Sequence, residues 1–303
     1  MRMVVVVLAL LSLVFLGAGC SDGDDDGSSR LRVVASTTQI GDFVSRVGGD
    51  HVHLTVLLKA GQDAHDFEPQ PSQVRALSQA RLVLLNGLGL DEFAEDAVDS
   101  SGSRTITISE GISPRGSDEE EHGEGDPHVW FSVANARLMV ANIRDAFSEA
   151  DPANSSSYQQ SADGYLAELA RLDANIRQQV STVAPACRKL VTNHDVLGYY
   201  AEAYGFQVVG SVIPATTTEA RPSAAQVADI VAKVRAERVP AIFAEAEANP
   251  DLVRQVAREA EVKVVDDLYG DSLGDEGSDG ETYVKMMEAN TSKIVDALKD
   301  CRP

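Results

Sequence analysis

The chain has 303 residues, 44% of them apolar, and a formal net charge of −21 at neutral pH. This length and apolar fraction are enough for two ordinary hydrophobic cores or one large one. The acidic balance argues against a nucleic-acid-binding protein, which needs a clustered basic surface, and makes cations the natural partners.

Residues 1–30 read as an export signal followed by a tether. One arginine, Arg2, precedes the apolar run MVVVVLALLSLVFL, which is too short to be a permanent membrane span. The following GAGC resembles a bacterial lipobox, which predicts a signal peptide over residues 1–19 and lipidation of Cys20. An ordinary cleaved signal with a chance cysteine is the alternative. Residues 20–30 are polar and acidic, and predict a disordered tether on an extracytoplasmic, lipid-anchored protein.

From residue 31 short β-branched runs alternate with amphipathic stretches, a pattern typical of an α/β domain with a mostly parallel sheet. The first series predicts strands at 31–37, 51–58, 81–86 and 105–109, with helices at 39–48, 71–80 and 132–150. The second predicts strands at 188–193, 206–212, 241–246 and 262–267, with helices at 223–239 and 250–260. We therefore expect an N-terminal lobe over 31–152 and a C-terminal lobe over 185–303.

The segment between the two series, residues 153–184, predicts one long linking helix. Its apolar residues recur at helical spacing, and prolines at 152 and 185 bound it. A helix of that length would reach from one lobe to the other, at about 1.5 Å per residue. Because a helix bends less freely than a loop, we do not expect a large closure of the lobes.

Four side chains stand beyond the carboxyl ends of predicted strands, where open α/β sheets place their ligands. They are His65, His128, His194 and Asp271, two from each lobe. Three imidazoles and a carboxylate make a complete tetrahedral set for Zn²⁺, which leaves no open position for catalysis; we predict no enzyme and no catalytic residue. On spacing alone, each histidine could equally be an ordinary loop or core residue.

Several longer motifs carry a resemblance to a known family. GQDAHDFEPQPSQV, DPHVWFSVANARLM, NHDVLGYYAEAYGF and YGDSLGDEGSDGETYVKMMEAN resemble, in order, those of the zinc and manganese solute-binding lipoproteins of bacterial ABC importers. The resemblance covers nearly everything from residue 31 onward. It implies two similar α/β lobes, a long rigid backbone helix and an ion in the interlobe cleft. It also places the family's metal ligands on the four residues named above.

The family differs at the third ligand, and that difference bears on the ion. A carboxylate there suits Mn²⁺, whereas an imidazole shifts the site toward Zn²⁺. Because this chain has His194, the resemblance implies a high-affinity Zn²⁺ receptor that delivers the ion to an ABC permease and its ATPase subunit. A Mn²⁺ receptor of the same architecture and a metal-binding surface adhesin are the alternatives. We expect a monomer.

Other residues are predicted to support the site. Glu68 and Asp126 lie close in sequence to proposed ligands and would orient them through hydrogen bonds, with ordinary surface or capping carboxylates as the alternative. Trp130 would pack beside His128 and exclude water. Glu245 points toward the cleft by topology but is not assigned as a ligand. The acidic loop 117–126 is either a weak collector of ions or a solvated loop.

Two cysteines are left once Cys20 is the lipid anchor, namely Cys187 and Cys301. An oxidising compartment favours a disulfide between them, while two buried thiols are the alternative.

Overall fold

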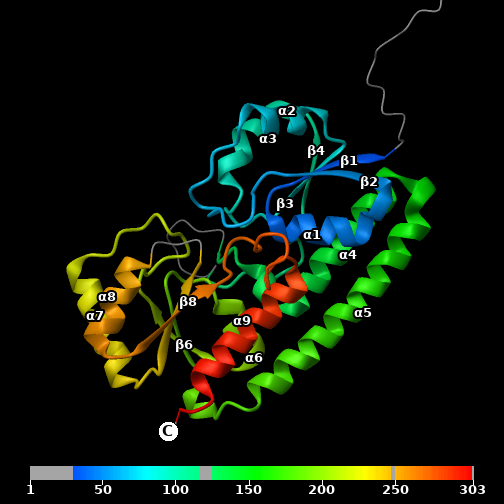
Figure 1. Ribbon diagram of the computed structural model, residues 1–303. Helices are drawn as coiled ribbons and strands as arrows, with labels where there is room; N and C mark the ends of the chain where they lie inside the picture. Colours follow the sequence, from blue (N-terminus) through cyan, green and yellow to red (C-terminus); the bar gives the residue numbers. More distant parts are fainter. Residues whose placement is uncertain (1–29, 117–124, 247–249, 302–303) are drawn as a thin grey trace, which may run out of the picture.

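The computed structural model describes residues 30–116, 125–246 and 250–301. The predicted signal peptide, Cys20, most of the tether and most of the acidic loop lie outside these ranges. Within them, no helix is both long enough and apolar enough to cross a membrane. The described chain forms two parallel four-stranded sheets with helices packed around them (Figure 1).

The first sheet, with the helices around it, forms what we call the first lobe. Its strands are β1 (Leu31–Ala35), β2 (Val52–Val56), β3 (Leu82–Leu85) and β4 (Arg104–Thr107), in the order β2-β1-β3-β4. Its helices are α1 (Thr38–Gly48), α2 (Pro71–Gln79) and α3 (Glu95–Ser101). The Thr37 side chain caps α1 by accepting from the backbone N–H of Ile40, so that helix begins directly after the first strand.

The second sheet repeats this plan and forms the second lobe. Its strands are β5 (Lys189–Thr192), β6 (Gln207–Ser211), β7 (Ala241–Glu245) and β8 (Lys263–Leu268), in the order β6-β5-β7-β8. Its helices are α6 (Gly198–Tyr204), α7 (Ala224–Ala236), α8 (Asp251–Ala260) and α9 (Tyr283–Leu298). Because every strand pair in both sheets is parallel and the orders match, the prediction of two similar α/β lobes is confirmed.

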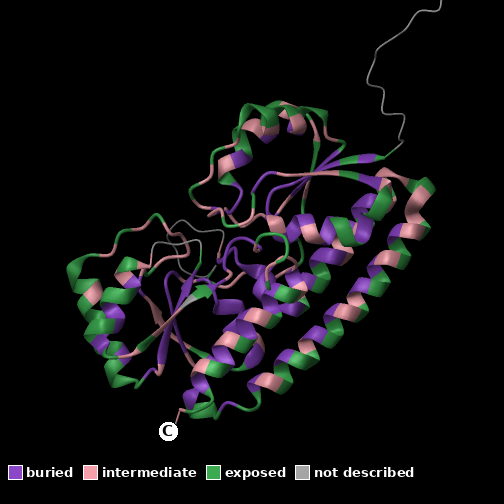
Figure 2. Ribbon diagram, in the orientation of Figure 1, coloured by how far each residue is buried: buried purple, intermediate pink, exposed green. Residues whose placement is uncertain are grey.

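Two long helices connect the lobes. Helix α4 (Val133–Ala150) leads into α5 (Ser155–Val180), which is about 39 Å long at 1.5 Å per residue. Helix α5 runs along one side of the molecule past both lobes (Figure 1). Its buried residues, among them Tyr165, Leu169 and Ile176, fall on one face, and Figure 2 shows that face turned toward the body of the protein.

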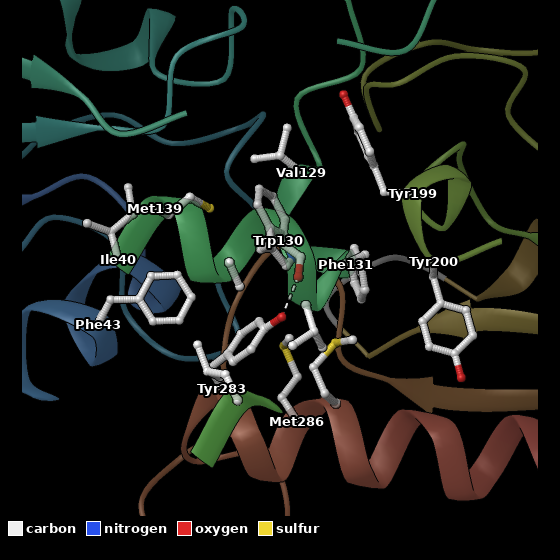
Figure 3. Packing of buried hydrophobic residues seen from close by; sticks show 14 of the residues in the cluster. Ile40, Phe43, Val129, Trp130, Phe131, Met139, Tyr199, Tyr200, Tyr283 and Met286 are labelled. Carbon is white, nitrogen blue, oxygen red and sulfur yellow. Dashed lines mark hydrogen bonds between the residues drawn. The ribbon is translucent and has the colours of Figure 1, made fainter. Parts of the chain in front are cut away.

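The hydrophobic core is continuous from one lobe to the other. A single buried cluster includes Phe43 of α1, Trp130 between the lobes, and Phe243 of β7 in the second sheet. Figure 3 shows Trp130 at its centre, where the Tyr283 hydroxyl donates a hydrogen bond of 2.6 Å to the Trp130 carbonyl oxygen. The rings of Phe43 and Tyr283 pack edge to face with centroids 4.9 Å apart. The lobes therefore share packing that resists a wide hinge motion.

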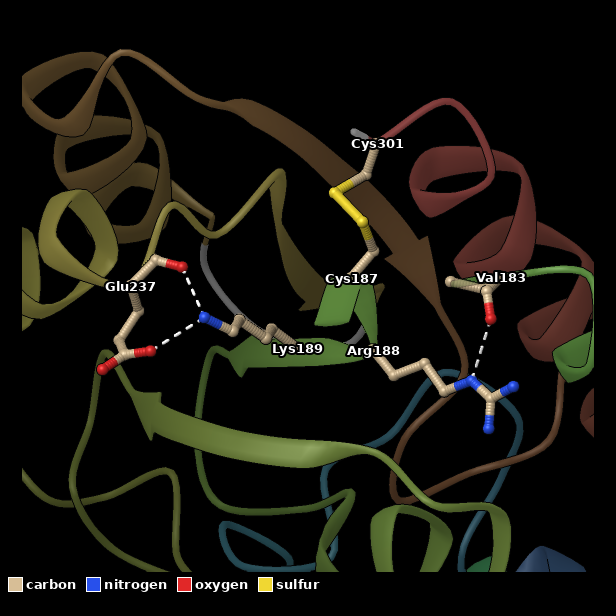
Figure 4. Close-up of a disulfide and its surroundings, with 6 residues drawn as sticks. All are labelled: Val183, Cys187, Arg188, Lys189, Glu237 and Cys301. Atoms are coloured by element: carbon tan, nitrogen blue, oxygen red, sulfur yellow. Dashed lines mark hydrogen bonds and ion pairs between the residues drawn. A yellow bond between two sulfur atoms is a disulfide. The ribbon is translucent and has the colours of Figure 1, made fainter. Parts of the chain in front are cut away.

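A disulfide joins Cys187 to Cys301, whose Cα atoms lie 6.0 Å apart and which are separated by 114 residues in sequence. Figure 4 shows the bond between the segment that precedes β5 and the residue that follows α9. It ties the C-terminal helix, which packs on both α5 and α1, to the base of the second sheet.

Replacing both cysteines, as Cys187→Ala with Cys301→Ala, should lower the free energy of unfolding by about 2–4 kcal/mol, because a long loop is no longer closed in the unfolded chain. Urea denaturation of the purified protein measures this, and wild-type protein under strong reductant should show the same loss. A loss below about 0.5 kcal/mol would contradict the expectation.

Candidate metal centre

The four predicted residues converge at the place where the two sheets face each other. His65 follows β2 through a loop, and His128 immediately precedes the short 3-10 turn Val129–Phe131. His194 comes two residues after β5, and Asp271 comes three residues after β8. Since all the strands are parallel, their carboxyl ends and the loops that follow meet in one interlobe region.

The geometry of this cluster is compact. One ligand-type atom from each of the four residues lies within 4.8 Å of all the others. The Nε2 atoms of His128, His65 and His194 lie 3.4, 3.6 and 3.8 Å from the nearest oxygen of Asp271. The Nε2 atoms of His128 and His194 are 3.3 Å apart. All three imidazoles thus present the same nitrogen to one shared point.

These spacings fit a bound cation better than a hydrogen-bond network. Around Zn²⁺ with bonds of about 2.0–2.1 Å, tetrahedral ligand atoms lie about 3.3 Å from one another. Four separations in the cluster, of 3.3 to 3.8 Å, are close to such edges, and all its ligand-type atoms lie within 4.8 Å of one another. Within the described residues, the buried Nε2 of His65 has no hydrogen-bond partner, although it faces the carboxylate of Asp271. Such an atom is costly to bury unless something binds it.

Electrostatic effects in the cluster follow from this burial. Burial raises the pKa of Asp271, but the hydrogen bond from His128 and the nearby imidazoles outweigh it and hold that pKa below its usual range. Burial also lowers the pKa of His128, yet hydrogen bonds to Asp126 and Asp271 raise it to about 10. Desolvation is the largest influence on His65 and lowers its pKa. Together these effects favour the charged forms of Asp271 and His128.

Buried carboxylates contact two of the imidazoles at Nδ1, the ring nitrogen that does not face Asp271. Nδ1 of His128 lies 2.8 Å from Oδ1 of Asp126, and Nδ1 of His194 lies 3.2 Å from Oε2 of Glu245. A carboxylate in this position orients the ring and favours the tautomer with the proton on Nδ1, which would leave Nε2 free for a metal. Asp126 occupies the position predicted for it. Glu245, noted only as pointing toward the cleft, has the same arrangement with His194.

The other two residues predicted to support the site, Trp130 and Glu68, differ in whether they contact a candidate ligand. Trp130 is fully buried, with its ring edge to face against His128 at 5.5 Å between centroids, so it does pack beside that ring. Glu68 is exposed, and no contact in the described structure joins it to His65, so the prediction that it orients that ring is not supported. Asp63 is next to His65 instead: its Oδ1 accepts from the His65 backbone N–H at 2.9 Å, and its Oδ2 from Thr218 Oγ1 at 2.6 Å.

The charge of the buried groups favours a bound cation. Asp126, Glu245 and Asp271 surround the imidazoles, and the guanidinium of Arg115 pairs with the first of them at 2.9 Å. When the imidazoles are neutral, the carboxylates of this group outnumber its one cation. A bound cation would offset this excess, since uncompensated charge is strongly disfavoured in a protein interior.

Only one of the four residues borders open space. A cavity of about 400 Å³ is lined by His65 and Phe93 from the first lobe and by Thr216 and Thr217 from the second. His128, His194 and Asp271 are almost completely buried, whereas His65 is partly exposed. An ion would therefore meet His65 before the other three.

Comparison with known proteins agrees with this geometry. The sequence matches, over residues 33–297, the family described as zinc-uptake complex component A, periplasmic. The manganese-binding lipoprotein MntA of Halalkalibacterium halodurans is 31% identical over 295 residues, covering 96% of this chain and 97% of the relative. The metal ABC transporter substrate-binding lipoprotein ScbA of Streptococcus cristatus is 30% identical over 304 residues, with the same coverage of 96% and 97%.

Solved structures give the same picture. The periplasmic zinc-binding protein TroA from Treponema pallidum superposes with a TM-score of 0.83 at 29% identity, covering 89% of this chain and 99% of that one. A manganese-bound periplasmic metal-binding protein from Candidatus Liberibacter asiaticus gives 0.81 at 29% identity, with coverage of 89% and 100%. The chain therefore belongs to the periplasmic zinc-uptake component A family, the metal-binding receptors of ABC transporters.

Proposed function

We propose that this protein captures one Zn²⁺ ion with His65, His128, His194 and Asp271 and delivers it to an ABC permease driven by an ATPase subunit. The observation that carries the proposal is the convergence of four donors, three of them almost completely buried, with one ligand-type atom from each within 4.8 Å of the others. Because all four donors come from the protein, the site suits holding an ion and leaves no open position for activating water.

The donor set supports zinc as the cargo. Three imidazole nitrogens with one carboxylate form a borderline-soft environment, and Zn²⁺ accepts both atom types in tetrahedral geometry. Manganese prefers oxygen donors and more than four ligands. The buried Trp130 beside His128 restricts additional water at that side of the site.

Manganese is the second candidate, and the relatives favour it. Several similar proteins are named for manganese, among them MntA of Halalkalibacterium halodurans and PsaA of Streptococcus anginosus. A receptor can carry the less tightly binding ion when the more competitive one is scarce, because selectivity in cells follows metal availability as well as affinity.

The proposed location is the outer face of the cell membrane, reached through a lipid on Cys20. The lipobox-like GAGC supports it, as do the names of relatives as substrate-binding lipoproteins. The anchor would keep the receptor near its permease, and the two would meet by diffusion in the plane of the membrane.

Zn²⁺ should bind the chelator-stripped protein one to one and at least about 100-fold more tightly than Mn²⁺, as the order of divalent affinities requires for nitrogen donors. His194→Ala should weaken zinc binding at least about 100-fold, because a direct ligand is lost. Competitive calorimetric titration measures both quantities. The exposed His53 offers a control, and His53→Ala should bind like the wild type. If Mn²⁺ bound nearly as tightly as Zn²⁺, the result would favour the second candidate, a manganese receptor.

Exchanging donor type at the third ligand should change the preference. His194→Glu combined with Glu245→Gln keeps the buried charge constant and gives the new carboxylate a hydrogen-bond donor behind it. The ratio of zinc to manganese affinity should fall at least about tenfold, because a hard oxygen replaces a nitrogen. The same competition titration measures the ratio, and an unchanged ratio in a folded variant would show that His194 does not set the preference.

Zinc affinity should fall with falling pH. His128, whose pKa is raised to about 10, holds a proton at neutral pH that the ion must displace. Each proton released weakens binding about tenfold per pH unit, so we expect at least that slope between pH 8 and pH 6. Titrations in buffers of different ionisation enthalpy count the protons directly. A flat affinity from pH 7.5 to pH 5 would contradict ligation by three histidines.

A further inference from the structure

One arginine connects the candidate ligand His128 to the second lobe. Nη1 of Arg115 lies 2.9 Å from Oδ2 of Asp126, and the other oxygen of that carboxylate accepts from Nδ1 of His128 at 2.8 Å. Guanidinium, carboxylate and imidazole form a chain that ends at the Nε2 atom facing the cluster. Arg115 thus stands directly behind the group that orients the ring.

The same arginine is seated on helix α6 of the second lobe. Its guanidinium carbon lies 5.5 Å from the centroid of the Tyr199 ring, and its backbone N–H donates to the Tyr199 hydroxyl at 3.0 Å. That hydroxyl in turn donates to the backbone oxygen of Asp126 at 2.7 Å. Nε of Arg115 is 3.5 Å from Glu202, which is largely exposed. Arg115 and Asp126, the two ends of the loop that leads to His128, are therefore both bound to α6.

A glycine in α6 leaves the space that the guanidinium fills. A Cβ added at Gly198 would lie 1.4 Å from Nη1 and 2.4 Å from Cζ of Arg115. The backbone of Gly198 is helical, so its conformation does not require glycine. Gly198 is the first residue of α6, and the absence of a side chain there leaves room for the guanidinium. An alanine would displace Nη1 from its present position beside Asp126.

We propose that Arg115 is a positioning residue: it holds Asp126 so that His128 keeps Nε2 aimed at the ion, and it links that orientation to the seating of the loop on α6. The inference rests on the proposed function, since it needs His128 to be a ligand. Outer partners of ligating histidines normally raise metal affinity about 10- to 100-fold. An arginine one step further out should contribute at the lower end of that range.

An exposed ion pair would be the simpler role, and the environment argues against it. Arg115 is only partly exposed, and Asp126 is buried. A buried carboxylate that loses its cation must find another partner, so the effect of removing the guanidinium falls on Asp126 and the ring it orients. By contrast, exposed pairs such as Arg104 with Glu149 contact no part of the site.

The test uses Arg115→Gln, Gly198→Ala and the double variant of the purified protein. We expect zinc affinity to fall about tenfold in Arg115→Gln. Gly198→Ala should lower it severalfold in the wild-type background and have no further effect once Arg115 is replaced, because the shorter glutamine leaves the new methyl group free of the clash. The visible absorption of the Co²⁺-loaded protein, which reports ligand geometry, should change in both single variants.

Matched controls are available on the chain. Arg75→Gln removes the same charge from an exposed position, and Gly164→Ala adds a methyl group in α5 where no atom lies within 4 Å; both should bind zinc like the wild type. Unchanged affinity and Co²⁺ spectrum in Arg115→Gln, even with a lowered melting temperature, would overturn the proposal and leave only a structural role. If the losses of zinc affinity in Arg115→Gln and Gly198→Ala simply add in the double variant, the proposed link through Gly198 is overturned. A wild-type protein that binds no zinc would refute the proposed function instead.

Discussion

The structure depends on the interaction of one buried carboxylate with three imidazoles. Asp271 is enclosed at the meeting point of the two sheets, and the Nε2 atoms of all three histidines face it. Hydrogen bonds to Asp126 and Asp271 raise the pKa of His128 and so favour its charged form beside Asp271. Burying these groups is unfavourable by itself, so the surrounding fold must hold them in place. The shared core provides this support, because Trp130 lies two residues after His128 and packs at its centre.

The position of His128 beside the shared core explains why a rigid frame suits this site. Metal–ligand distances tolerate deviations of only about 0.2 Å, so flexible loops alone would bind an ion weakly. Here the turn that carries His128 continues into α4, which packs along α5, and α5 contacts α9 in turn. Across the cleft, hydrogen bonds from Leu273 N to Thr38 Oγ1 and from Gly61 N to Ser272 Oγ fasten the loop of Asp271 to the first lobe. The ligand positions are thus set by helices and by contacts between lobes.

Much of this could be predicted from the sequence, and the gaps have physical reasons. Parallel strands bring their carboxyl ends together, so topology alone brought His65, His128, His194 and Asp271 to one region, and local spacing found Asp126 and Trp130. The contact of Glu245 with His194 spans 51 residues, and nothing in either segment specifies it. Glu68 is exposed, in keeping with the alternative of a surface carboxylate, because nearness in sequence to a ligand says nothing about the direction of a side chain. Helix α9 is less plain in the sequence, because its buried face includes the polar Asn290 and Thr291, which bond to Tyr269 and Tyr200 and interrupt the apolar pattern.

The division of the ligands between the sheets bears on release. In the proposed site, His65 and His128 follow strands of the first sheet, and His194 and Asp271 follow strands of the second, so a relative displacement of the lobes would lengthen the metal–ligand distances across the cleft. Because these distances tolerate deviations of only about 0.2 Å, a small displacement would weaken the binding of the ion. A receptor with a continuous core does not need a wide hinge to let its ion go. It needs a partner that binds the protein with slightly displaced lobes more tightly than it binds the ion-bound protein. The difference between these two affinities sets how far the equilibrium moves toward release of the ion.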